Sequence, residues 1–107
     1  MKNISQLLKA AQTAQTRMAE LQEELGRITV EGSAGGGMVT VTLTAKGELK
    51  AIAIDPSLLK SEEKEILEDL IVAAHQNARA AAEERMKTEM ARLASEMGLP
   101  PGMGLPF

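Results

Sequence analysis

The sequence predicts an α+β fold in which a long helix is followed by three antiparallel strands and a second long helix. Changes in the hydrophobic period indicate this order. Apolar residues recur every three or four positions in residues 4–28, alternate with threonine in residues 39–44, and return to a helical spacing after residue 61. Glycine-bearing turns separate three short apolar runs, which is typical of an antiparallel meander.

The first helix is expected over about residues 3–27. Its apolar positions follow the alternating three-and-four spacing of a helix that packs along one seam, and they are Ile4, Leu7, Ala11, Ala14, Met18, Leu21, Leu25 and Ile28. Gly26 weakens the last turn and predicts the end of this helix.

The strands are expected at residues 29–31, 39–44 and 49–54, because β-prone residues gather there. Residues 46–48, with a central glycine, form the second turn, and the Asp-Pro-Ser sequence at residues 55–57 ends the sheet.

The second helix is expected to begin near Ser61, a suitable N-cap, and to continue until Gly98. Its length of about 36 residues corresponds to about 54 Å, which exceeds the size of a domain with a radius of gyration near ~13 Å. We therefore expect the helix to project from its own core or to meet a partner. Its apolar side also rotates along the helix, so the two halves face different surroundings; the early positions are Leu67, Ile71, Ala74 and Ala78, and the late ones Met86, Met90 and Met97.

A single domain over residues 1–97 is expected, followed by an irregular Pro/Gly tail over residues 98–107. Apolar residues make up 44% of the 107 residues, but the aromatic residues amount to one phenylalanine. So thin a core favours oligomerisation. The absence of cysteine and of a secretory signal favours the cytosol, and no apolar run approaches the ~20 residues of a membrane span, so no membrane role is predicted.

No catalytic, cofactor or metal site is predicted. Gly32 and Gly37 have the spacing of a phosphate-binding loop, but Met38 and Val39 stand where its lysine and hydroxyl residue are required. The glycines therefore predict a flexible hairpin loop. His75 is the only histidine and is interpreted as a packing or surface residue. The acidic residues at positions 62–69 lack the glycine-turned loop of a calcium site and indicate a solvated first turn.

Basic residues of the first helix are the informative feature, despite a net charge of −3. Lys2, Lys9 and Arg17 fall within an arc of about 80° on the helical wheel, opposite the apolar seam. The first 19 residues contain no acid. The alternatives are an ordinary solvated face and a stripe that contacts a phosphate backbone. In the second helix, acids match the bases in number, and the spacing predicts a surface salt-bridge ladder through Arg85, Glu89, Arg92 and Glu96.

The whole pattern resembles the YbaB/EbfC family of bacterial nucleoid-associated proteins. The matching segments span nearly the entire chain, and they are LKAAQTAQTRMAELQEEL, TVEGSAGGGMVTVT, AIAIDPSLL, EILEDLIVAAHQNA and LPPGMGLPF. The resemblance implies a tweezers-like homodimer that binds double-stranded DNA without enzymatic activity and with little sequence preference. It also implies links to chromosome organisation, gene regulation and recombinational repair.

The sites implied by the resemblance are cations of both helices, namely Lys2, Lys9, Arg17, Arg79, Arg85 and Arg92. The hypothesis is a non-catalytic, cytoplasmic, nucleoid-associated protein without a cofactor, which binds double-stranded DNA as a homodimer through phosphate electrostatics. Protein partners in repair or replication are compatible with it. The alternative is a scaffold or adaptor that grips a protein partner with its heptad seam and its methionine-rich distal helix.

Overall fold

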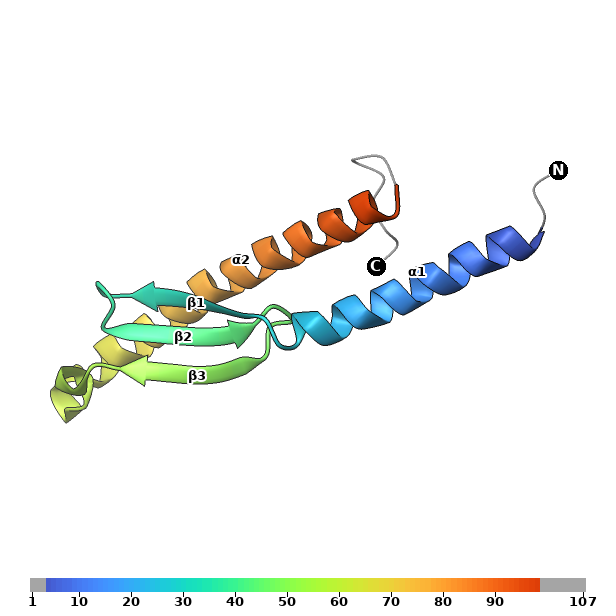
Figure 1. Ribbon diagram of the computed structural model, residues 1–107. Coiled ribbons are helices and arrows are strands. Elements are labelled where there is room, and N and C mark those ends of the chain that lie inside the picture. Colours follow the sequence, from blue (N-terminus) through green and yellow to red (C-terminus); the bar gives the residue numbers. More distant parts are fainter. Residues whose placement is uncertain (1–3, 99–107) are drawn as a thin grey trace.

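The computed structural model describes residues 4–98 and has the predicted order of helix, three strands and helix (Figure 1). The molecule is elongated, 73 × 22 × 15 Å, and both long helices extend past the same end of the sheet (Figure 1). The elements are α1 (Ile4–Leu25), β1 (Thr29–Ala34), β2 (Val39–Thr44), β3 (Leu49–Ile54), the 3-10 turns η1 (Pro56–Leu58) and η2 (Ser61–Glu63), and α2 (Lys64–Glu96). Apart from Gly98, the expected tail lies outside the described residues, and the domain boundary stays a prediction.

The sheet is an antiparallel meander in the order β1-β2-β3. Its first strand runs to Ala34, three residues beyond the predicted end, because Gly32, Ser33 and Ala34 continue the pairing with β2. Local propensity marks a Gly-Ser-Ala sequence as a loop, and only the partner strand extends it. The following glycines, Gly35 to Gly37, all have positive φ, so they form the expected hairpin turn.

The main core lies between the sheet and the first part of α2. Its buried residues come from the helix-facing side of β2, from η1 and from α2, and they are Val39, Val41, Leu43, Leu58, Ala74 and Ala78. Gly32 of β1 lies directly under α2: a Cβ built on it would be 2.1 Å from the Ala78 backbone nitrogen and 2.6 Å from the Ala74 carbonyl oxygen. The absence of a side chain at this position permits that close approach.

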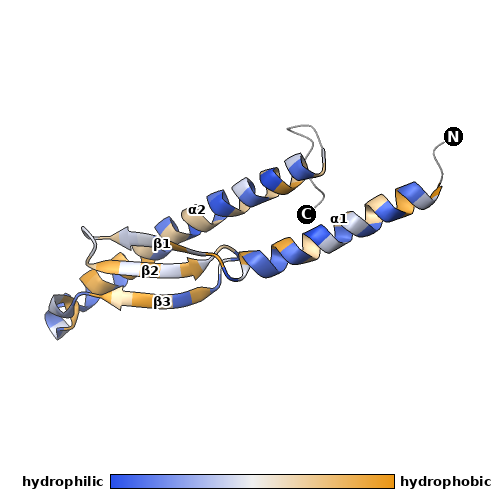
Figure 2. Cartoon of the chain, viewed as in Figure 1, coloured by the Kyte–Doolittle hydropathy of each residue, from blue (hydrophilic) through white to orange (hydrophobic). Residues whose placement is uncertain are grey.

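A second buried cluster joins the end of α1 to the distal part of α2. It is built on Leu21, Leu25, Ala45 and Leu93, with partly buried side chains around it that include Met86, Met90 and Met97. The two halves of α2 therefore face different surroundings, as the rotated apolar side predicted. The seam of α1 is packed only at this end: Ile4, Leu7 and Leu8 are exposed, and hydrophobic residues recur along the protruding part of α1 (Figure 2).

The predicted start of the second helix at Ser61 is wrong. Residues 61–63 form the 3-10 turn η2, and α2 begins at Lys64 with Glu63 as its N-cap and without a capping hydrogen bond from a side chain. The hydroxyl group of Ser61 donates instead to the Glu62 carboxylate at 3.1 Å. At the other end α2 stops at Glu96, and Gly98 has a φ of 75°, in accord with the predicted stop.

Asp55 caps η1 and is the source of a predicted pH effect. The side-chain hydrogen bond with Ser57, and then the Ser57 backbone N–H at 2.8 Å from Asp55 Oδ1, lower the pKa of Asp55 below its ordinary value. A carboxylate with a lowered pKa stabilises the fold above its unfolded pKa, and this contribution disappears as the pH falls through the folded pKa. We expect Asp55→Ala to be less stable than the wild type at about pH 6, and the difference to shrink as the pH falls below the ordinary pKa of the carboxyl group and through its lowered folded value. Urea unfolding at about pH 6 and in a series of more acidic buffers measures the difference, and a difference that persists undiminished under acid conditions would contradict the assignment.

Candidate nucleic-acid interface

Two of the cations predicted on the first helix, Lys9 and Arg17, lie on the protruding N-terminal part of α1, residues 4–19, which we call the α1 arm. Lys9 and Arg17 are exposed on α1. Within residues 4–98, neither side chain has a carboxylate within ion-pair distance. Lys2 lies outside the described residues. The acid-free arm thus carries positive charge that no carboxylate of residues 4–98 neutralises by direct contact.

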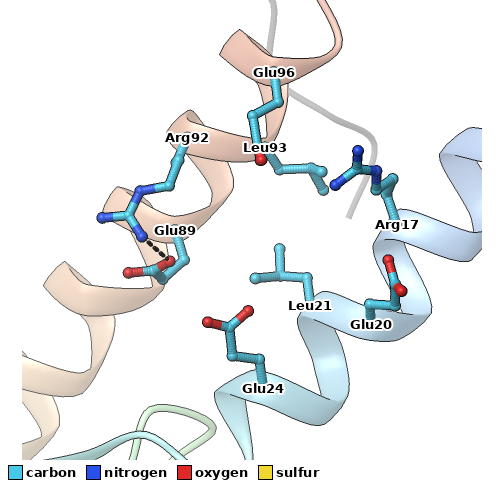
Figure 3. Close-up of a pocket in the computed structure, with 8 residues that line it drawn as sticks. All are labelled: Arg17, Glu20, Leu21, Glu24, Glu89, Arg92, Leu93 and Glu96. Carbon is cyan, nitrogen blue, oxygen red and sulfur yellow. Dashed lines mark hydrogen bonds and ion pairs between the residues drawn. The ribbon is translucent and has the colours of Figure 1, made fainter.

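After residue 19, where α1 approaches the sheet, the helix carries acidic residues. A groove of about 260 Å³ lies between α1 and the distal part of α2 (Figure 3). It is lined by four glutamates, two arginines and two leucines, namely Glu20, Glu24, Glu89, Glu96, Arg17, Arg92, Leu21 and Leu93. Arg17 therefore lies at the boundary between the acid-free part of α1 and the acidic groove.

The three predicted cations of α2 all pair with acids. Arg79 lies 3.6 Å from Glu83, and both side chains are largely exposed. Arg85 and Arg92 both bind Glu89, the first through Nε at 3.0 Å and the second through a terminal nitrogen at 2.9 Å. The predicted ladder forms only in part, because no Arg92–Glu96 pair occurs within residues 4–98.

The prediction that this ladder lies on the surface is wrong for its central residue. The side chain of Glu89 is only 3% exposed, and it lies among the residues that line the groove between the two helices. A buried carboxylate is costly unless it is paired and hydrogen-bonded. Both of its oxygens accept a hydrogen bond from an arginine, which meets this requirement.

An open apolar concavity of about 420 Å³ lies beside the main core, between β3 and α2. Leu49 and Ile52 of β3 and Val72 of α2 line it and are exposed. His75 also lines it and is half-buried, in accord with a packing or surface position. Among residues 4–98, no cluster of three or more acids and histidines is placed to hold a metal ion, and no helix is long and apolar enough to cross a membrane.

Comparison with known proteins decides the family. The model of the YbaB/EbfC DNA-binding family matches residues 1–97. The chain belongs to this family. Its relatives include nucleoid-associated proteins of Rhodospirillum rubrum (53% identity), Methylocella silvestris (50%) and Agrobacterium fabrum (47%), each aligned over the full length of both chains.

The crystal structure of a similar protein supports the fold. The crystal structure of an uncharacterized Helicobacter pylori protein matches with a TM-score of 0.71 at 31% identity, and the match covers 91% of this chain and 98% of that one. The predicted α+β architecture is confirmed by the element order described above, and the similarity to this crystal structure supports it.

Two features of this family member escaped the sequence reasoning. The first is the burial of Glu89, which a charge pattern cannot reveal because exposure depends on where α1 lies. The second is the open concavity beside β3. Its signal was present in the apolar residues Leu49 and Ile52, which were interpreted only as part of a strand.

Proposed function

We propose that this YbaB/EbfC family member is a cytoplasmic, nucleoid-associated protein that binds double-stranded DNA as a homodimer, without catalysis and largely through phosphate electrostatics. The family description and the relatives' names support DNA as the partner. They do not favour a scaffold that binds only proteins. Roles in nucleoid organisation, gene regulation or recombinational repair follow from the same proposal.

The observation that carries the proposal is the state of the charges on α1. Lys9 and Arg17 lie on an exposed arm with no acid in residues 4–19, so a phosphate does not compete with an existing carboxylate partner. The positive end of the helix dipole lies at the same tip and adds to the attraction. Lys2 extends the stripe in sequence. The α2 arginines are weaker candidates for phosphate contacts than Lys9 and Arg17, because each already binds a glutamate.

The homodimer is proposed to form over the open concavity beside β3. A helix with its side chains is about 10–12 Å wide, and strands are about 4.8 Å apart, so one helix covers about two strands. In this protomer α2 covers β1 and β2 and leaves β3 bare. Ile52 is 41% exposed and Val72 57% exposed. A second copy related by a two-fold axis would bring its own α2 over this strand, and the same surface would serve both protomers.

The dimer surface can be tested with one charge on either face of β3. Ile52→Asp is expected to yield monomers, because a carboxylate would be buried at the interface, while the protomer keeps its fold since the position is already partly exposed. Ala53→Asp, the neighbouring residue on the opposite face, is the control and should leave a dimer. Light scattering gives the mass and circular dichroism the helicity. A dimer with Ile52→Asp would refute the surface.

The DNA-binding mechanism predicts a specific salt dependence. Six cations, Lys2, Lys9 and Arg17 of both protomers, should by themselves contribute about −5 to the log–log slope of affinity against salt. Titration of unrelated duplexes at several salt concentrations measures this slope and the sequence preference. A slope near zero would contradict a phosphate-based grip. Failure to bind any duplex at low salt would reject DNA binding itself.

A further inference from the structure

Glu89 differs from every other acid that forms an ion pair within residues 4–98. In the remaining pairs, Arg27–Glu23 and Arg79–Glu83, the distances are 3.6 Å and both side chains are exposed. Such pairs contribute little. Glu89 is buried, uses both oxygens, and binds two arginines at shorter distances.

The two arginines nevertheless face solvent. The side chain of Arg85 is 45% exposed and that of Arg92 is 61% exposed. They are seven positions apart in the sequence, so they lie on the same side of α2 and about 10 Å apart along its axis. Each guanidinium has five N–H donors, and one of these is used for Glu89. Most of the donors of both groups thus remain available.

We propose that Glu89 is a positioning residue that holds the guanidinium groups of Arg85 and Arg92 in fixed orientations for contact with DNA phosphates. The inference rests on the proposed function. Releasing either arginine would leave a buried carboxylate with one partner fewer, so the protein fold itself enforces the orientation. Arginines that are already ordered lose less side-chain entropy when they bind phosphate. Arg85, Glu89 and Arg92 together carry a net charge of +1, but Glu20, Glu24 and Glu96 line the same groove. The proposed contribution is therefore oriented hydrogen bonding at contact distance and not long-range attraction.

The direction in which Glu89→Gln changes DNA affinity distinguishes a positioning role of Glu89 from an effect of net charge alone. Glu89→Gln removes one negative charge from each protomer, so electrostatics alone predicts tighter DNA binding. Positioning predicts the reverse: the glutamine oxygen accepts from one arginine, its amide group cannot accept from the other, and that arginine is released. We expect duplex affinity to fall about tenfold, given the ordering cost of long side chains. Glu96→Gln is the matched control, since Glu96 is exposed in the same groove and removes the same charge without binding Arg92 at ion-pair distance.

A second variant tests the inference even if Glu89→Gln does not fold correctly. Glu89→Met preserves the volume and replaces the buried charge with an apolar group. The two arginines that lose their partner are 45% and 61% exposed, so water can solvate them and no buried charge is left unpaired. It should keep the thermal midpoint and the oligomeric mass of the wild type, yet bind DNA about tenfold more weakly. A purely structural role for Glu89 would not separate affinity from stability in this way.

The experiment is a fluorescence-anisotropy titration of a random duplex with the full-length wild type and the three variants, with circular dichroism and light scattering on each. Weaker binding by folded Glu89→Gln and Glu89→Met, with Glu96→Gln equal to or tighter than the wild type, supports the inference. Either folded Glu89 variant binding as tightly as the wild type overturns it, and DNA binding itself still stands. A wild type that fails to bind duplex DNA overturns the proposed function instead.

Discussion

Gly32→Ala is expected to lower the free energy of unfolding by about 3 kcal/mol, at the upper end of the usual cost of overpacking. The new Cβ would lie 2.1 Å from the Ala78 nitrogen and 2.6 Å from both the Ala78 Cα and the Ala74 carbonyl oxygen. These are backbone atoms of α2, so no side-chain rotation relieves the clash and the helix must move away from β1. Thermal unfolding should show a midpoint about 15 °C lower.

Gly26→Ala is the matched control for this prediction. The nearest atom to a Cβ at position 26 is the Glu23 carbonyl oxygen at 3.4 Å, which is an ordinary contact. Gly26→Ala should change the free energy of unfolding by no more than about 0.5 kcal/mol. Equal midpoints for the Gly32→Ala and Gly26→Ala proteins would show that α2 does not lie as close to β1 as described here.

Charge reversal on the α1 arm should have the largest effect on DNA binding. Lys9→Glu combined with Arg17→Glu removes four phosphate contacts from a dimer, and each is worth about tenfold in affinity near 0.1 M salt. The repulsion of the new acids adds to this loss. We expect affinity to fall by about 10⁴-fold or more on unrelated duplexes alike, with an unchanged dimer mass, and a gel-shift titration measures it.

A control with the same net charge distinguishes the arm from the overall charge. Lys60 and Lys64 are exposed at the opposite end of the molecule, near the start of α2 (Figure 1). Reversing both changes the net charge equally but lies away from the arm, so affinity should change by less than about tenfold through screened long-range repulsion. If both double variants lose affinity equally, the proposed role of Lys9 and Arg17 is wrong.

The sequence anticipated the candidate interface unevenly. The absence of acids around Lys9 can be read along the chain, and so can the pairing of Arg79 and Arg85 with acids four residues later, because such partners lie one helical turn apart. Which of these cations are free to contact DNA cannot be predicted from the sequence in the same way. Whether an arginine is free or bound to a buried acid depends on the packing of a helix that is remote in sequence.

Local patterns were enough for the order of the elements, the hairpin turns, the change of face along α2 and the family, since hydrophobic period, glycine and charge act over a few neighbouring residues. Packing between distant segments was needed for the rest. Gly32 became a contact point and Glu89 a buried acid because α2 crosses β1 and then meets α1. β3 stayed uncovered because one helix is wide enough for only two strands, and that geometry is not written in any single segment.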